Sequence, residues 1–154
     1  MWKAHTFFLV FIALALNVRA YARDECLDCH RQLQGKLADA ARLFEISIHY
    51  KVGLSCAACH GGDPNATDMN QAKRSGTGYT PSPAFSEIPR LCASCHSNAQ
   101  YMKRFNPQLR VDQTSQYLTS VHGQKSLRGD TRVATCTSCH STHDIRRVQD
   151  PAAS

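Results

Sequence analysis

Cysteine and histidine recur in one fixed pattern along this chain of 154 residues. Two cysteine thiols three positions apart can add to the two vinyl groups of a haem, and a histidine directly after the second cysteine can bind the haem iron. This Cys-x-x-Cys-His pattern occurs four times and uses all eight cysteines of the chain. The sequence therefore predicts four covalently attached c-type haems, each with its iron. The predicted attachment residues are Cys26, Cys29, Cys56, Cys59, Cys92, Cys95, Cys136 and Cys139, and the predicted proximal iron ligands are His30, His60, His96 and His140.

Eight cysteines could instead form a disulfide framework, and pairs of Cys-x-x-Cys units could form zinc knuckles. Neither alternative requires a histidine after the second cysteine, and a histidine stands there in all four copies. Haem attachment explains both the spacing of the cysteines and the position of the histidines, so we favour it.

Three histidines remain once the four motifs and His5, near the amino terminus, are set aside: His49, His122 and His143. Neutral imidazole is a common ligand of haem iron, and four irons in a small volume each have a sixth position. We therefore expect all three histidines to be distal iron ligands. His143 follows His140 by only three positions, so it cannot reach the far face of the haem that His140 binds. It must ligate a neighbouring haem.

Three spare histidines leave one iron without a histidine in its sixth position. Thioether sulfur is a known axial ligand, so Met102 and Met69 are candidates. A partner protein could also supply the ligand, or this haem could be five-coordinate. The sequence does not say which haem is concerned, nor which haem His122 serves.

A helix is expected to carry the first spare histidine. Apolar residues recur at steps of three and four from Leu33 to Ile48, which predicts an amphipathic helix with His49 near its carboxyl end. Residues 61–90 are rich in Gly, Pro, Ser, Thr and Asn and predict a long loop, with one turn of helix near Asn70.

A second helix is expected to carry His122. Asp112 can cap this helix and Gly123 can end it, which places His122 near its carboxyl end. Ser120-Val-His122 repeats Ser47-Ile-His49, and a haem motif follows each copy, so the chain holds a weak internal repeat. A shorter helix is expected between the third motif and Asp112, at residues 97–105.

Residues 1–22 have the layout of a secretory signal peptide. A lysine precedes an apolar run from Phe7 to Leu16, and an Ala-x-Ala cleavage site ends at Ala22. The run holds about ten residues, whereas a spanning helix needs about 20. We therefore expect cleavage after Ala22, no stable membrane span afterwards, and a single exported domain at residues 23–154 in the periplasm or outside the cell.

The small size of the mature chain predicts its fold class. Four haems would share roughly 130 residues, about 33 each, which is too little protein for an ordinary side-chain core. The haems must then form much of the core. We expect a mainly α fold with long loops and little or no sheet, in which thioether and iron bonds stabilise short helices.

The charge of the chain does not point to nucleic acid. Lysine and arginine number 18 against 12 acidic residues, a formal net charge of +6. Loss of the signal peptide and the propionates of four haems would bring the protein close to neutral. The arginines are scattered and no recognition motif accompanies them, so nucleic-acid binding is not expected.

The segments YLTSVHG, VATCTSCHSTHDI and CAACHGGDP resemble those of tetrahaem c-type cytochromes from nitrogen- and metal-respiring microbes. These relatives include electron carriers of the hydroxylamine-oxidation type and subunits of extracellular cytochrome filaments. The resemblance covers most of the chain from Cys26 to Ile145. It implies distal ligation by His49, His122 and His143, and haems stacked in parallel pairs. Low-potential class III cytochromes usually have adjacent histidine pairs, and this chain has none, so it resembles them less closely.

These patterns predict an exported tetrahaem electron carrier, not an enzyme, that passes electrons along closely packed and mostly bis-histidine haems to a redox partner protein. Two alternatives remain open. The chain could be a homo-oligomeric subunit of an extracellular cytochrome filament, although such subunits typically have histidine on both faces of every haem. It could also be an enzyme that reduces or oxidises a small nitrogen or oxygen species at a five-coordinate haem.

Overall fold

The computed structural model describes residues 24–153. The signal peptide expected at residues 1–22 lies outside these residues. Residues 24–153 form short helices joined by turns and long loops, and they contain no strand, which confirms the expected mainly α fold. None of these helices is long and apolar enough to cross a membrane. The elements are α1 Glu25–Arg31, α2 Lys36–Ile46, α3 Ile48–Lys51, α4 Ala57–His60, α5 Met69–Ala72, η1 Phe85–Glu87, α6 Ile88–His96, α7 Ala99–Met102, α8 Gln113–Thr119, α9 Val121–Leu127 and α10 Cys136–His140.

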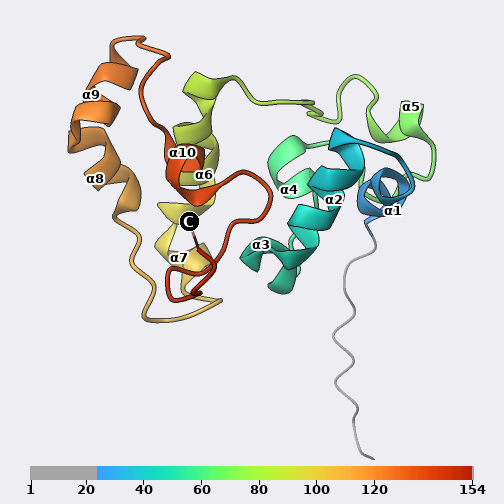
Figure 1. The fold of residues 1–154 in the computed structure, drawn as a ribbon, viewed down its shortest axis with the longest axis horizontal. Coiled ribbons are helices and arrows are strands. Elements are labelled where there is room, and N and C mark those ends of the chain that lie inside the picture. The colour runs from blue at the N-terminus through green and yellow to red at the C-terminus, as the bar shows by residue number, and fades with distance from the viewer. Residues whose placement is uncertain (1–23, 154) are drawn as a thin grey trace, which may run out of the picture.

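Two groups of helices lie along the long axis of the molecule (Figure 1). The amino-terminal group, residues 24–72, contains α1 to α5, and α2 packs against α1 and α3. The carboxy-terminal group, residues 85–140, contains α6 to α10, and α6 packs against α7, α8 and α10. The chain after α10 returns to the amino-terminal group, where the Ile48 amide donates a 2.7 Å hydrogen bond to the Ile145 carbonyl. This last segment ties the two groups together.

Helix α2 is shorter than the sequence pattern predicts. Its buried face consists of Ala38, Ala41 and Phe44, and the last two pack against Leu27 of α1. Leu33 precedes the helix and is 42% exposed. The expectation of one continuous apolar face from Leu33 is therefore wrong, because the helix begins only after Gly35, which turns the chain at a φ of +64°.

The same helix also ends earlier, at Ser47. Ser47 is extended, with φ −71° and ψ 156°, and its side chain accepts a 3.1 Å hydrogen bond from the Tyr50 amide. Ser47 is therefore the N-cap of the new helix α3. His49 is the second residue of α3 and does not lie near the carboxyl end of a longer helix.

A second break of this kind occurs at Ser120. Its side chain accepts a 3.1 Å hydrogen bond from the Gly123 amide and caps α9, so His122 again lies in the first turn of a helix. Gly123 lies inside α9 and does not end a helix as expected. A Cβ atom at Gly123 would lie 2.0 Å from the Tyr117 carbonyl oxygen, so only glycine fits against the end of α8. Asp112 precedes α8 as predicted, but its side chain makes no capping hydrogen bond.

The remaining short helices partly match the expectations. Helix α5 provides the turn expected near Asn70. Helix α7 covers only part of residues 97–105, and it begins where the Asn98 side chain accepts a hydrogen bond from the Tyr101 amide.

The side-chain core is small, as the chain length predicts. Within residues 24–153 the buried apolar residues are Leu27, Ala38, Ala41, Phe44, Ala72, Met102 and Val133. Large apolar side chains elsewhere are exposed, among them Val121 at 68% and Leu127 at 67%. So few buried side chains cannot account for the stability of a domain of this size, and bound cofactors would supply the rest.

Candidate haem-binding site

Each Cys-x-x-Cys-His motif forms about one turn of helix. We call residues 26–30, 56–60, 92–96 and 136–140 sites 1 to 4. Site 1 lies in α1, and site 2 consists of α4 and its N-cap Cys56. Site 3 forms the end of α6, and site 4 is α10. Residues three and four positions apart share one face of a helix, so in each site the second thiol and the imidazole lie on the same side as the first thiol. This is the arrangement that attachment to one haem requires.

The alternative uses of cysteine find no support in this geometry. All eight cysteines are free, so the structure has no disulfide framework. In residues 24–153 no group of three or more His, Cys, Asp or Glu side chains is arranged to hold a metal ion by itself. The cysteines are therefore not gathered into zinc knuckles.

Consecutive sites lie next to one another in space. One thiol of each site interacts electrostatically with a thiol of the next, and the contact between sites 3 and 4 is a hydrogen bond. The interacting pairs are Cys26 with Cys56, Cys59 with Cys95, and Cys92 with Cys136. The four sites therefore form a series in the order of the chain.

Two pairs of histidine rings from different parts of the chain lie close together. The ring centres of His49 and His96 are 6.1 Å apart, and those of His60 and His143 are also 6.1 Å apart. A metal ion bound by an imidazole nitrogen on each side, at about 2.0 Å, holds the two ring centres about 6 Å apart. Both pairs therefore have the spacing of two axial ligands with one iron between them.

The two pairs differ in ring orientation and in origin. The ring planes of His49 and His96 are inclined by 72°, and those of His60 and His143 by 17°. Each pair joins a spare histidine to a motif histidine from a distant part of the chain. His143 thus lies opposite the histidine of site 2, and not opposite that of its own neighbour His140.

Burial favours the neutral form, which binds metal, at His49, His96 and His143. It lowers the pKa of His49, and the nearby His96 lowers it further. It also lowers the pKa of His96, with His140 adding to the effect, and the pKa of His143, with His60 adding. A neutral imidazole has a free ring nitrogen for iron. The thiol spacing, the ring spacing and the small core all fit c-type haem.

His122 lies apart from these pairs. It is exposed in the first turn of α9, and in the described residues no other aromatic ring contacts it. Helices α8 and α9 are nevertheless held next to site 4. The Tyr117 hydroxyl donates a 3.1 Å hydrogen bond to the Ala134 carbonyl, one residue before the N-cap of α10.

The two candidate methionines lie in different groups of helices. Met102 is buried in α7 and belongs to the carboxy-terminal group, beside the ring pair Tyr101 and Phe105. Met69 is 60% exposed at the start of α5, in the amino-terminal group. Neither thioether is placed opposite a motif histidine by a contact in the described residues.

Sequence reasoning missed Asp24, a buried carboxylate between sites 1 and 2. Its Oδ1 accepts a 3.2 Å hydrogen bond from the Leu27 amide and so caps α1, while its Oδ2 accepts a 2.7 Å hydrogen bond from the Cys56 amide. One side chain thus fixes the start of both haem motifs relative to each other. An aspartate directly before a helical motif is the N-cap signal that could have revealed half of this role. The contact with Cys56 depends on tertiary structure alone.

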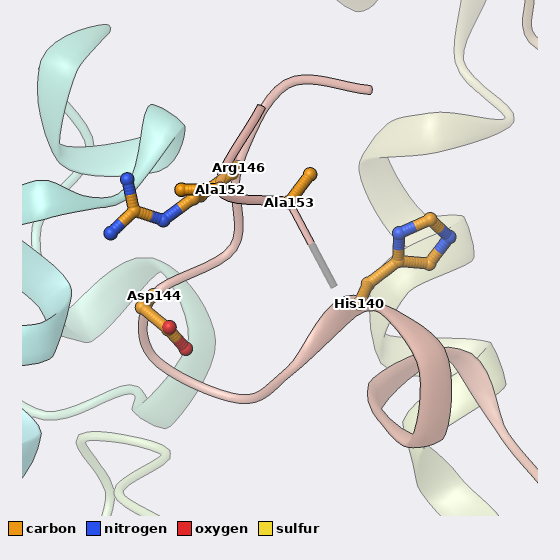
Figure 2. Close-up of a pocket in the computed structure, with 5 residues that line it drawn as sticks. All are labelled: His140, Asp144, Arg146, Ala152 and Ala153. Atoms are coloured by element: carbon orange, nitrogen blue, oxygen red, sulfur yellow. The ribbon is translucent and has the colours of Figure 1, made fainter. Parts of the chain in front are cut away.

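A small hollow beside site 4 is lined by side chains that diverge. Figure 2 shows the His140 imidazole on one side of the carboxy-terminal segment and the Arg146 guanidinium on the other. A hydrogen bond from the Ser141 hydroxyl is the main reason that the pKa of Asp144 is lowered. These side chains do not converge on one point, so the hollow gives no support to a catalytic role.

Comparisons with known proteins agree with this geometry. A family model described as cytochrome c3 matches residues 48–150, and a family model described as cytochrome c554 and c-prime matches residues 12–61. No curated protein and no solved structure matches the chain. The first match holds sites 2 to 4 and all three spare histidines, and the second holds sites 1 and 2.

Proposed function

From the premise that this chain belongs to the cytochrome c3 family of multihaem electron-transfer cytochromes, we propose that it is an exported carrier of four covalently bound c-type haems. The matched residues contain no adjacent histidine pair, and such pairs are therefore not required for membership.

The observation that carries the proposal is the pair of ring contacts at 6.1 Å. On this basis His49 and His96 ligate the iron of site 3, and His143 and His60 ligate the iron of site 2. The hydrogen bond from Tyr117 to Ala134 supports His122 as the distal ligand of site 4.

The protein would hold the haems next to one another in a fixed order, which electron transfer between them requires. When bound, each haem supplies an iron that accepts and releases one electron, and imidazole on both faces favours a low reduction potential. The electrostatic interactions between thiols of consecutive sites support a series of four haems in chain order, from site 1 in α1 to site 4 in α10. Asp24 and the Ile48 to Ile145 hydrogen bond hold this series together. A redox partner protein would exchange electrons with an exposed part of it.

The proposal also includes the cellular setting. Removal of residues 1–22 would release a single domain from residue 23 onward into the periplasm or the medium. Haem is attached to proteins of this kind outside the cytoplasm, which agrees with a signal peptide. Mass spectrometry of the native protein gives both the new amino terminus and the number of haems.

Redox potentiometry of the holoprotein, followed by its optical spectrum, tests the electron-transfer role. We expect four haems that titrate over a broad range of low potentials, because burial and neighbouring charges differ between the sites. A single uniform potential in the range of methionine-ligated cytochromes would contradict the proposal.

Low-temperature EPR tests the ligand pairs. Because the ring planes are inclined by 72° in one pair and 17° in the other, the oxidised protein should give two different low-spin signals. His49→Met should alter the signal of site 3 alone, and the matched variant His143→Met should alter that of site 2 alone. If both variants change the same signal, the pairing is wrong.

A further inference from the structure

The two proposed ligand pairs differ in the groups that lie behind their rings. His60 and His143 belong to site 2, and His49 and His96 belong to site 3. A hydrogen bond or a negative charge on the side of an imidazole that faces away from the metal makes it a stronger electron donor. A stronger donor stabilises the oxidised iron and so lowers the reduction potential. The surroundings of the four rings therefore bear on the order of the potentials.

The backbone holds the ring of His60. Its Nδ1 donates a 3.0 Å hydrogen bond to the Thr80 carbonyl, because a carbonyl oxygen can only accept. This bond leaves Nε2 as the ring nitrogen that is free to bind iron. The Thr80 amide donates a 2.7 Å hydrogen bond back to the His60 carbonyl. The end of site 2 is thus joined twice to a residue twenty positions later in the chain.

A close approach of two glycines brings the Thr80 carbonyl to this ring. Gly61 has a φ of +64°, and a Cβ atom there would lie 2.2 Å from the Gly78 carbonyl oxygen. Only glycine permits this contact. The Gly62 amide also donates a 3.0 Å hydrogen bond to the Thr77 carbonyl. The loop therefore lies against the chain that leaves site 2, and its backbone reaches the site 2 imidazole.

A carboxylate lies next to the other ligand of site 2. Asp144 and His143 interact electrostatically, and the Ser141 hydroxyl donates a hydrogen bond to the Asp144 carboxylate. Ser141 has φ 63° and ψ −176°, a conformation that is nearly restricted to glycine. Arg146 also interacts with Asp144, but it is paired with Asp150 at 3.5 Å, and Figure 2 shows its guanidinium directed away from the Asp144 carboxylate. The Asp144 charge therefore remains to act on His143.

The rings of site 3 have no partners of this kind. Within residues 24–153 neither the His49 ring nor the His96 ring makes a hydrogen bond. Their electrostatic neighbours are other imidazoles, His96 for His49 and His140 for His96. An imidazole carries no negative charge, so these neighbours do not make the two ligands stronger donors.

We propose that site 2 has a lower reduction potential than site 3, because the Thr80 carbonyl and the Asp144 carboxylate make both of its ligands stronger donors. This inference rests on the proposed function, because it needs a haem at each site and the ligand pairs given there. Thr80 and Asp144 act through the histidines and are positioning residues. An electron on site 2 then moves spontaneously to site 3, which gives this step of the series a direction.

A redox titration of the holoprotein followed by low-temperature EPR tests the order. The inclinations of 17° and 72° give site 2 and site 3 different low-spin signals, and His143→Met and His49→Met identify them. We expect the signal of site 3 to be lost first on reduction and that of site 2 to be lost at a lower potential. The opposite order, or loss of both together, would overturn the inference and leave the electron-transfer role intact. Fewer than four haems by pyridine haemochrome assay would overturn the proposed function and the inference together.

Asp144→Asn tests the charge beside His143. The asparagine side-chain oxygen still accepts a hydrogen bond from Ser141, so the turn is kept while the charge is removed. We expect the potential of site 2 to rise toward that of site 3, which should not move. The matched variant Asp39→Asn removes an exposed carboxylate that is paired with Arg42 on α2 and should change neither potential. An unchanged site 2 potential in Asp144→Asn would refute the role of this carboxylate.

Gly61→Ala tests the bond from the loop. The added Cβ atom must push the loop away, so the Thr80 carbonyl leaves the site 2 imidazole. We expect a higher site 2 potential and a shifted site 2 EPR signal. The matched variant Gly76→Ala lies in the same loop and also has a positive φ, +88°, but its Cβ atom meets nothing within 4 Å. Equal changes in the two variants would refute the role of Thr80, and Asp144→Asn tests the order of the potentials independently of this loop.

Discussion

The turns at residues 47–50 and 120–123 have the same backbone and different surroundings. Ser47 has φ −71° and ψ 156°, and Ser120 has φ −73° and ψ 163°. Each serine ends one helix, caps the next, and accepts a 3.1 Å hydrogen bond from the amide three residues later. In both turns a histidine occupies the second position of the new helix.

The two turns differ in how deeply they are buried. Ser47 is fully buried, the Ile48 amide is bound by Ile145, and His49 faces His96. In the other turn, Val121 is 68% exposed and His122 lies on the surface. The local sequence thus places a histidine at the second position of a helix, whereas segments distant in sequence determine which residues contact it.

Removal of the two histidines should give the largest difference. His49→Ala breaks the proposed link between α3 and α6 through iron, so we expect a loss of about 3 kcal/mol or more in the free energy of unfolding. His122→Ala removes the proposed distal ligand of site 4, but α8 and α9 are still held beside α10 by the hydrogen bond from Tyr117, so we expect a smaller loss of about 1 to 2 kcal/mol. Thermal unfolding of both holoproteins, with EPR to count high-spin haem, measures the two effects. Equal losses of stability would show that the turns are equivalent in the intact protein.

The residue after each histidine should give the next largest difference. Gly123→Ala places a Cβ atom 2.0 Å from the Tyr117 carbonyl oxygen, so α9 must shift, at a cost of about 2 to 3 kcal/mol. At the matching position, Tyr50→Ala removes an edge contact with Phe44 at 5.7 Å and should cost about 1 to 2 kcal/mol. Chemical denaturation measures both values. A neutral Gly123→Ala would mean that α9 does not lie against the end of α8.

Removal of the caps should give the smallest difference. Ser47→Ala and Ser120→Ala each delete an N-cap, which costs about 1 kcal/mol on average. We expect Ser47→Ala to lie at the upper end, near 2 kcal/mol, because its partner amide is then left without a hydrogen bond in a buried place. Ser120→Ala should lie nearer 0.5 kcal/mol, since water can replace the hydroxyl. The reverse order in denaturant unfolding would contradict the contrast in burial.

Local sequence predicted the motifs and the repeat but not the exact helices that carry them. The recurring cysteines and Ser-x-His units have short-range patterns, and the structure places both copies of the unit in matching turns. The breaks at Ser47 and Ser120 were missed because apolar periodicity continues through them, and only the serine hydrogen bonds show that a new helix begins. The sequence predicted that His143 ligates a haem other than that of its own site, and its ring centre lies 6.1 Å from that of His60. That this neighbour is His60 depends on the path of the last segment, which no local pattern encodes.

The hydrogen bond between Ile48 and Ile145 also has a consequence for the order of assembly. It joins positions about a hundred residues apart, and such distant contacts form late in folding. A chain is synthesised from its amino end, so the Ile48 amide can form this hydrogen bond only after residue 145 has been synthesised. His143 belongs to the same late segment and contacts the much earlier His60. The proposed ligand pair of site 2 would therefore be completed last, after the motifs of sites 1 and 4 have both been synthesised.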